Sequence, residues 1–271
     1  MTREKVRALL AQLRFNGMAG ALDTELDRAE REASAAPQLI HRLLSAEAAY
    51  RRERTLAYRL DHARLPWRWT LDTFPFERQP GVNKSQIRTL AGLEFVRRAE
   101  NVLLIGEPGT GKTGIAIGLL REACLNGYNG RFYNAQVLLD DLYASLADRS
   151  TSKLLKRLSR FQPLLIDELG YLTLKPEQSN AFFRLMDQRY NRASTIITTN
   201  LTTENWYELF QKKSLVDALL SRLEHHCITI HIKGPSLRTP ELAPPPTSPP
   251  ETAIKQSTRR AASPKPPTRS R

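Results

Sequence analysis

Residues 101–120, NVLLIGEPGTGKTGIAIGLL, run from an apolar stretch through a glycine-rich turn into a second apolar stretch. The first stretch is continuously apolar, as a strand buried on both faces of a parallel sheet is. The second stretch is long enough for a helix. A buried strand, a tight turn and a helix in this order are typical of α/β architectures, so the segment predicts a parallel sheet covered by helices.

Four more β-rich runs favour the same fold class. They lie at 130–134, 163–168, 194–200 and 227–232, and several are continuously apolar. Helical stretches lie between most of them, which is the alternation expected of parallel strands joined by helices. We therefore expect residues 82–239 to form an α/β three-layer sandwich around a mostly parallel five-stranded sheet.

The rest of the chain divides by composition. Apolar residues at helical spacing through residues 1–65 predict a small helical domain. Its arginine-rich end either binds DNA or a partner or is a solvated, salt-bridged face. Residues 66–81 contain three prolines and four aromatic residues, which predicts a linker whose rings pack on the next domain. Residues 240–271 contain nine prolines and scattered basic residues, which predicts a disordered basic tail. The aromatic residues of the linker are Trp67, Trp69, Phe74 and Phe76.

The charge balance indicates a polyanionic partner. The chain has 41 basic and 28 acidic residues, a formal net charge of +13. Such an excess favours nucleic acid or an anionic membrane, although it also serves solubility. The apolar runs are too short for a membrane span and the first residues do not resemble a signal peptide. Because of these two observations, we expect no membrane partner. Cys124 and Cys227 form no CxxC pair, so we expect ordinary thiols in a protein of the reducing cytoplasm.

The glycine-rich turn fits the phosphate-loop pattern G-x-x-x-x-G-K-[ST]. Its glycines let backbone N–H groups wrap phosphates, and the N-terminus of the following helix favours the same anion. Lys112 would reach the β- and γ-phosphates of ATP, and the Thr113 hydroxyl would bind Mg²⁺. The residues expected to contact the nucleotide are Gly106, Glu107, Pro108, Gly109, Thr110, Gly111, Lys112, Thr113 and Gly114.

Two further strands end in polar residues. PLLIDELGY ends its apolar run in Asp167 and Glu168. Asp167 can complete the Mg²⁺ shell, and Glu168 can orient or deprotonate the attacking water. A water-activating glutamate favours hydrolysis over phosphoryl transfer to a small molecule, because a kinase must exclude water. STIITTN ends in Asn200, whose amide could hydrogen-bond the γ-phosphate or the water, or could only cap a turn.

Several basic residues have two interpretations. Arg222, on an amphipathic helix, could be a surface ion-pair residue or an arginine finger for a neighbour's ATP. Two clusters of basic residues are predicted either to contact duplex DNA non-specifically or to be solvated helix faces. These clusters are Arg51, Arg52 and Arg54, and Lys153, Lys156, Arg157 and Arg160. Lys212 and Lys213 form a further basic site in a loop-like stretch.

Together these motifs resemble the AAA+ ATPases, specifically the IstB/DnaC-like branch. The resemblance covers about residues 5–238 and rests on FVRRAENVLLIGEPGTGKT, LLIDELGYL, QRYNRASTIITTNL, ALLSRLEHH and IKGPSLR. It implies an ATP-dependent helper of insertion-sequence transposition, with a transposase, duplex DNA and further copies of itself as partners. The alternatives are a helicase loader of the DnaC type, a small-molecule kinase, and a scaffold that binds ATP without hydrolysing it.

The resemblance also implies roles for three residues. Asn200 corresponds to the sensor-1 residue, and Arg222 to an arginine finger that acts between subunits of an oligomer. Arg238 corresponds to a second sensor, although this chain has GPSLR where GESYR is usual. Gly114 also departs from the family pattern directly after the phosphate loop.

Overall fold

The computed structural model describes residues 2–170, 174–210 and 213–238. The predictions for the 240–271 tail and for Lys212 lie outside the described residues. Five strands form one sheet in the order β2-β3-β4-β1-β5, and every pairing is parallel. The predicted α/β class and five-stranded sheet are confirmed. The strands are β1 (Asn101–Gly106), β2 (Arg131–Asn134), β3 (Leu164–Asp167), β4 (Thr195–Thr199) and β5 (Cys227–Ile232).

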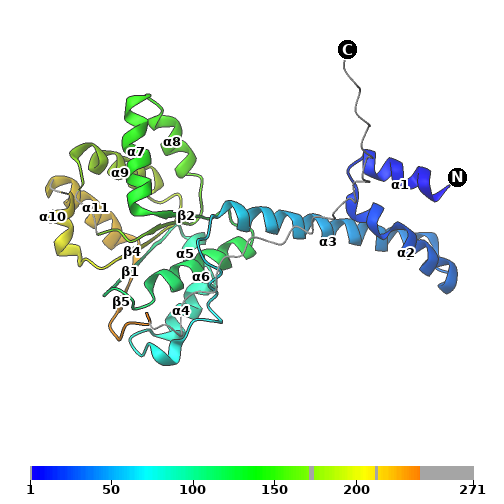
Figure 1. Ribbon diagram of the computed structural model, residues 1–271, viewed down its shortest axis with the longest axis horizontal. Coiled ribbons are helices and arrows are strands. Elements are labelled where there is room, and N and C mark those ends of the chain that lie inside the picture. The colour runs from blue at the N-terminus through cyan, green and yellow to red at the C-terminus, as the bar shows by residue number, and fades with distance from the viewer. Residues whose placement is uncertain (1, 171–173, 211–212, 239–271) are drawn as a thin grey trace, which may run out of the picture.

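Helices cover both faces of the sheet (Figure 1). Successive strand residues alternate between two cores, so that Leu103 and Leu104 of β1 contribute to different hydrophobic clusters. One face is covered by α4 (Lys84–Ala91), α5 (Glu94–Arg97) and α6 (Lys112–Leu125). The other is covered by α7 (Ala135–Ala147), α8 (Thr151–Leu158), α9 (Pro176–Arg189), α10 (Trp206–Phe210) and α11 (Lys213–His225).

The register brings the polar strand ends together. Ile105 of β1 pairs with Thr199 of β4, and Asn134 of β2 pairs with Asp167 of β3. All five strands point the same way, so their carboxyl ends form one edge of the sheet. Ligands of open parallel sheets bind outside this edge. Because β1 lies between β4 and β5, the turn after β1 is flanked by the carboxyl ends of both strands.

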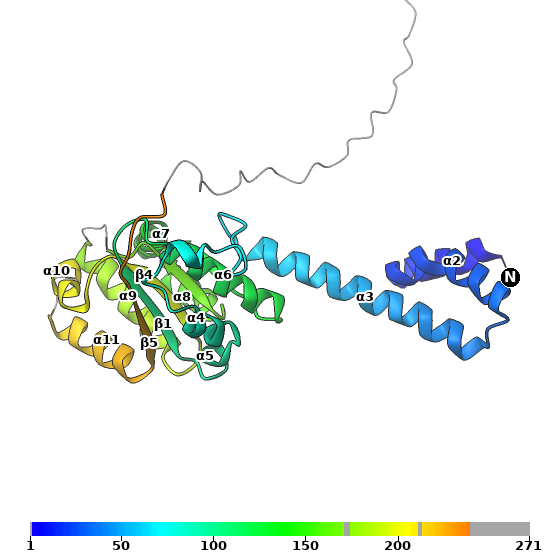
Figure 2. The same cartoon turned by 90° about the horizontal axis from the view of Figure 1, so that it is seen from below.

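The N-terminal helices form a separate unit at the end of a long stalk. Helix α2 (Asn16–Glu32) packs on the first part of α3 (Ala36–His62), and α1 (Arg3–Gln12) packs on α2. Helix α3 has 27 residues, about 40 Å at 1.5 Å per residue. Its second half leaves the helical unit and reaches the α/β domain (Figure 2). Residues 48–55 are exposed on every side, which is typical of a helix that bridges two domains.

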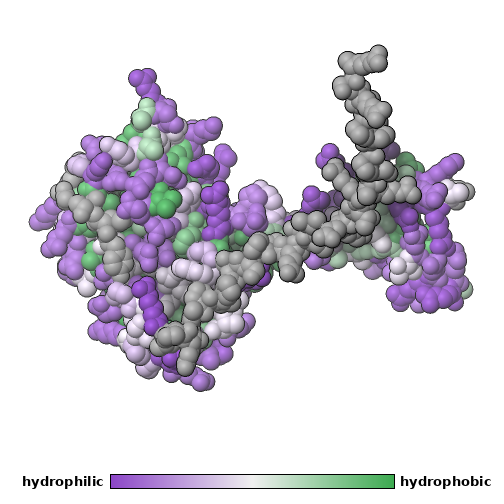
Figure 3. Space-filling model, viewed as in Figure 1, coloured by the Kyte–Doolittle hydropathy of each residue, from purple (hydrophilic) through white to green (hydrophobic). Residues whose placement is uncertain are grey.

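Residues 66–81 join α3 to the α/β domain through one short 3-10 turn, η1 (Phe76–Arg78). Phe74 is buried, and Trp69 and Phe76 pack on the core of the domain as expected. Trp67 is 36% exposed, so the expectation of packing is wrong for this ring. The visible surface is mostly hydrophilic with small separate hydrophobic patches (Figure 3). Among the described residues, no helix is long and apolar enough to cross a membrane.

Candidate nucleotide-binding site

The turn between β1 and α6 is a cradle that side chains would fill. Gly109 and Gly111 have φ angles of 83° and 91°, in the left-handed region that favours glycine. A Cβ on Gly111 would lie 2.7 Å from the Phe74 ring, and one on Gly109 would clash with Ser236. The side of the loop that faces Phe74 and Ser236 is therefore packed tightly. Lys112, which follows Gly111, is the first residue of α6. These constraints fit a loop whose backbone wraps an anion.

Lys112 folds back over the loop that precedes it. Its Nζ donates to the carbonyl oxygens of Gly106 at 2.7 Å and Glu107 at 2.8 Å. Burial lowers the pKa of Lys112, the negative charge of Asp167 opposes this change, and Arg238 adds to it. The ammonium thus lies within the cradle, where the phosphates of ATP would meet it.

Asp167 connects β3 to the start of α6. Its Oδ1 accepts hydrogen bonds from Thr113 Oγ1 at 2.9 Å and Thr198 Oγ1 at 2.6 Å. The residue is 3% exposed. Burial raises the pKa of the Asp167 carboxyl, and the bonds from Thr198 and Thr113 oppose that rise. A hydroxyl and a carboxylate side by side are suitable ligands for Mg²⁺, which takes its other ligands from water and phosphate.

Glu168 leaves the strand in an unusual conformation. Its φ angle is 61°, and its backbone N–H donates to Thr198 Oγ1 at 2.9 Å. The Glu168 Oε2 atom accepts a hydrogen bond from Asn134 Nδ2 at 3.1 Å. Non-glycine residues with positive φ often carry strain at functional sites. The carboxylate is held at the carboxyl edge of the sheet, where a general base for an attacking water would act.

Asn200 and Arg238 lie near the same edge. Asn200 follows β4, and its buried Oδ1 has no hydrogen-bond partner among the described residues. This oxygen lies 2.7 Å from the position of a Cβ on Gly170, in the segment just after Glu168. The Arg238 Cγ lies 3.4 Å from the corresponding position on Gly109, beside the phosphate loop. The structure therefore places Arg238 beside the phosphate loop and Asn200 beside the segment that follows Glu168.

Arg222 lies away from this loop. Its Nη2 is 2.8 Å from Asp187 Oδ1, and its guanidinium lies 5.9 Å from the Tyr190 ring centroid. Helix α11 ends just before β5, where the His226 carbonyl accepts from the Asn101 N–H at 2.7 Å. This is the amino-terminal edge of the sheet. A six-residue strand, roughly 20 Å long, separates it from the phosphate loop, so Arg222 cannot reach its own nucleotide.

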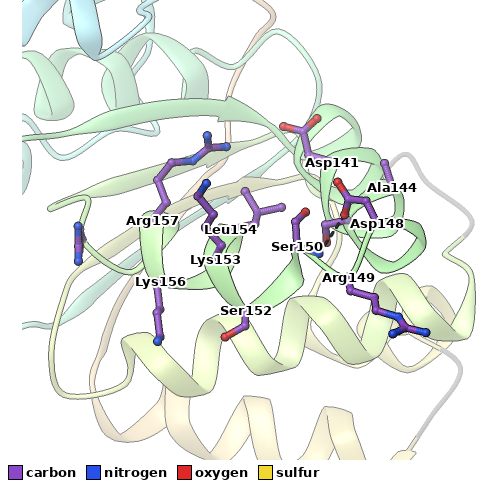
Figure 4. Close-up of a pocket in the computed structure, with 12 residues that line it drawn as sticks. Asp141, Ala144, Asp148, Arg149, Ser150, Ser152, Lys153, Leu154, Lys156 and Arg157 are labelled. Carbon is purple, nitrogen blue, oxygen red and sulfur yellow. Dashed lines mark hydrogen bonds between the residues drawn. The ribbon is translucent and has the colours of Figure 1, made fainter.

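The basic residues of α8 border a groove between α7 and α8 (Figure 4). Its volume is about 960 Å³, and Asp141 and Asp148 lie among its lining residues. In Figure 4, Lys153 and Arg157 extend from one side of α8, whereas Lys156 extends from the other. The basic side chains of α8 are therefore divided between two sides of the helix. The basic lining residues are Arg149, Lys153, Lys156, Arg157 and Arg160.

The α3 arginines differ in their surroundings. Arg51 Nε donates to Glu47 Oε1 at 2.6 Å, and its guanidinium lies over the Phe15 ring. Glu47 is 5% exposed and also accepts from the Gly17 N–H, so Arg51 neutralises a carboxylate that holds α2 on α3. Arg52 and Arg54 are exposed. Lys213 is the first residue of α11, so its expected place in a loop is wrong.

Sequence reasoning missed three residues that support the site. Thr198 contacts both acidic residues, Asn134 holds Glu168, and Gln79 donates to the Thr110 carbonyl at 3.0 Å. Thr198 and Asn134 lie at or near strand ends beside the acidic pair, a position that could have drawn attention to them. The sequence offered no comparable signal for Gln79, which lies 31 residues before its partner.

The parallel sheet, the phosphate loop after β1 and the acidic pair after β3 define a P-loop protein of the AAA+ type. The family model of the IstB-like ATP binding protein matches residues 8–242. The chain therefore belongs to the IstB-like family of ATP-binding proteins.

Two relatives show how far this similarity extends. The chain is 37% identical over 234 residues to the ATP-binding protein of insertion sequence IS21 from Pseudomonas aeruginosa, covering 86% of this chain and 88% of that protein. It is also 37% identical over 201 residues to the ATP-binding protein of IS5376 from Geobacillus stearothermophilus, covering 74% and 80%.

Solved structures share the fold. The DnaC helicase loader aligns with a TM-score of 0.53 and 25% identity, over 62% of this chain and 98% of that one. AMPPCP-bound DnaA from Aquifex aeolicus aligns with a TM-score of 0.51 and 20% identity, over 61% and 49%. The likeness to DnaA concerns the fold alone.

Proposed function

We propose that this protein is an ATP-hydrolysing, DNA-binding helper of a transposase. The observation that carries the proposal is the meeting of Lys112, the Thr113–Asp167 pair and Glu168 at one edge of the sheet. Family membership supports ATP as the nucleotide. The relatives named after insertion sequences support transposition as the process in which the protein acts.

In the proposed reaction, the loop amides and Lys112 bind the phosphates of ATP. Thr113 and Asp167 would hold Mg²⁺, whose charge stabilises the negative charge on the phosphoryl oxygens. Glu168 accepts a proton from water as the water oxygen bonds to the γ-phosphorus. The bond from that phosphorus to the bridging oxygen breaks, which gives ADP and phosphate. Asn200, with its free acceptor near Gly170, orients the water or the γ-phosphate.

Assembly completes the active site in this proposal. Arg222 lies at the amino-terminal edge of the sheet, too far from its own phosphate loop to act there. A second subunit that places this edge against the loop would supply the guanidinium, which is worth roughly 10³–10⁵ in rate in related reactions. An isolated subunit would therefore bind ATP but hydrolyse it slowly, and DNA that gathers subunits would stimulate hydrolysis.

Two surfaces are proposed to contact duplex DNA. The α7–α8 groove presents Lys153 and Arg157 on one side of α8. The exposed stalk presents Arg52 and Arg54. Charges of this kind bind phosphates without reading sequence, so affinity should fall steeply with salt. Arg51 is less suited to this role because Glu47 already engages it.

A second candidate is a helicase loader, which the alignment with DnaC favours. The two functions use the same ATP site and differ in the protein partner. Pull-down of the purified protein with an insertion-sequence transposase, and separately with a replicative helicase, distinguishes them. Capture of the helicase alone would favour the loader.

The proposed activity is tested by measuring ATP hydrolysis with and without duplex DNA, together with the mass of the ATP-bound protein. We expect DNA to raise turnover per subunit and ATP with DNA to produce a larger assembly. Lys112→Ala serves as the control for contaminating ATPases, since it removes the charge expected to bind the phosphates. ATP turnover indistinguishable from that control would overturn the assignment as an ATPase.

A further inference from the structure

The segment between α3 and α4 forms a strap across the phosphate loop; it comprises residues 66–81. Three residues before it begins, the Ala63 carbonyl accepts from the Phe132 N–H of β2 at 2.8 Å. At its end, Gly81 packs against Lys233, just after β5. The strap therefore runs from one edge of the sheet to the other. Between these ends Leu71 lies over Gly118, and Phe74 lies over Gly111 and Gly114.

Gln79 is the polar anchor of this strap. The residue is fully buried, at 0% exposure. Its Nε2 donates to the Thr110 carbonyl in the phosphate loop at 3.0 Å and to the Pro235 carbonyl at 2.9 Å. The amide packs so closely on Gly234 that a Cβ there would clash with Gln79 Oε1. One side chain thus ties three segments together: the strap, the phosphate loop and the segment that carries Arg238.

The bond to Thr110 has a direct consequence for anion binding. In a trans peptide the carbonyl and the following N–H point in opposite directions. When Gln79 holds the Thr110 carbonyl on the packed side of the loop, the Gly111 N–H is directed to the other side, toward the cradle. The Leu237 N–H holds the Gly109 carbonyl at 2.7 Å, which secures the Arg238 segment to the same loop.

We propose that Gln79 is a positioning residue for ATP: it holds the phosphate loop in its binding conformation and joins that loop to the Arg238 segment. This inference rests on the proposed nucleotide site. Gln79 does not touch the phosphates in this account. It acts through the Thr110–Gly111 peptide, so its loss should affect ATP affinity and KM more than turnover at saturating ATP.

The test compares Gln79→Met with Gln162→Met. Methionine keeps the approximate volume of glutamine but has no N–H donors. Gln162 is a matched control because its Nε2 donates to the Val96 carbonyl at 3.0 Å, also across a long stretch of sequence. Fluorescence titration with a labelled ATP analogue measures affinity, and circular dichroism with thermal melting establishes that each variant is folded.

We expect Gln79→Met to weaken ATP binding by about tenfold, as the loss of one hydrogen bond to the phosphate loop and one to the Arg238 segment allows. KM for ATP should rise by a similar factor while kcat at saturation stays within about twofold, and Gln162→Met should bind as wild type. Gln79→Asn keeps the amide on a shorter side chain and should show a smaller loss of ATP affinity. This second variant tests the inference if Gln79→Met does not fold.

The outcomes separate this inference from the proposed function. Wild-type protein that does not bind the ATP analogue would overturn the nucleotide site and the inference with it. Wild-type binding together with unchanged affinity in the folded Gln79 variants would overturn the inference alone. A loss of affinity in Gln162→Met as large as in Gln79→Met would show a general packing effect and would also contradict the role given to Gln79.

Discussion

Replacing Thr198 by valine should destabilise the fold in a pH-dependent way. Thr198 Oγ1 donates to Asp167 at 2.6 Å and accepts from the Glu168 N–H at 2.9 Å, and valine can do neither. A hydrogen bond to a charged group contributes roughly 1.5–3 kcal/mol. We therefore expect the free energy of unfolding to fall by about 2 kcal/mol when Asp167 is ionised. The melting temperature should then fall by about 4–8 °C.

The direction of the pH dependence follows from the pKa of Asp167. Burial raises this pKa in the fold above its ordinary value, and the bond from Thr198 opposes the rise. Stability linked to a raised pKa is present at low pH and is lost as pH rises through the folded value. Thr198→Val raises that pKa further. The stability difference between wild type and variant should therefore be largest at alkaline pH and should shrink as the pH falls.

Thermal melting across a pH series measures this effect, with Thr199→Val as the matched control. Thr199 lies next along β4, and its Oγ1 accepts from the neutral Leu201 N–H at 3.0 Å. Its loss should cost about 1 kcal/mol at every pH. The reasoning is refuted if Thr198→Val and Thr199→Val lose the same stability and neither loss changes with pH.

Three further variants test the nucleotide and DNA sites. Lys112→Ala should lose ATP binding, since no charge then faces the β- and γ-phosphates, yet bind DNA as wild type without nucleotide; unchanged binding of a labelled ATP analogue would contradict the role of the loop. Glu168→Gln should bind ATP but hydrolyse it roughly 10²-fold more slowly in a steady-state assay, and wild-type turnover would remove Glu168 from the mechanism. Reversing the charges of Lys153 and Arg157 should lower the slope of log affinity against log salt by roughly 0.9 per lost phosphate contact. Weaker DNA binding with the full slope would instead indicate a folding effect.

The sheet could be predicted from the sequence because several of its strands are continuously apolar. Runs such as residues 101–105 and 163–168 contain enough adjacent apolar residues to be buried on both faces, and little else explains them. The phosphate loop and Asp167 were predictable for a related reason. The loop follows one continuously apolar strand, and Asp167 ends another. The end of each strand in the sequence therefore also marks a position at the edge of the sheet.

The supporting contacts were not predictable, since they depend on packing between distant segments. Gln79 lies among prolines and aromatics with no local sign of its bond to Thr110. Trp67 and Phe74 are both aromatic residues of the strap, yet Phe74 is buried against the phosphate loop and Trp67 is 36% exposed. Arg51 pairs with Glu47 four residues earlier on the same helix, a spacing that the sequence does show. What the sequence does not show is that Glu47 also accepts from the Gly17 N–H, because that bond depends on the packing of α2 on α3.

The central claim is that ATP hydrolysis needs a loop from one subunit and Arg222 from another. Mixing Arg222→Ala with Lys112→Ala in the presence of DNA tests it most directly. Each protein alone should hydrolyse ATP poorly. The mixture should recover part of the wild-type rate, because some interfaces then join an intact loop to an intact arginine. Co-assembly of the two variants with no recovered activity would contradict the claim.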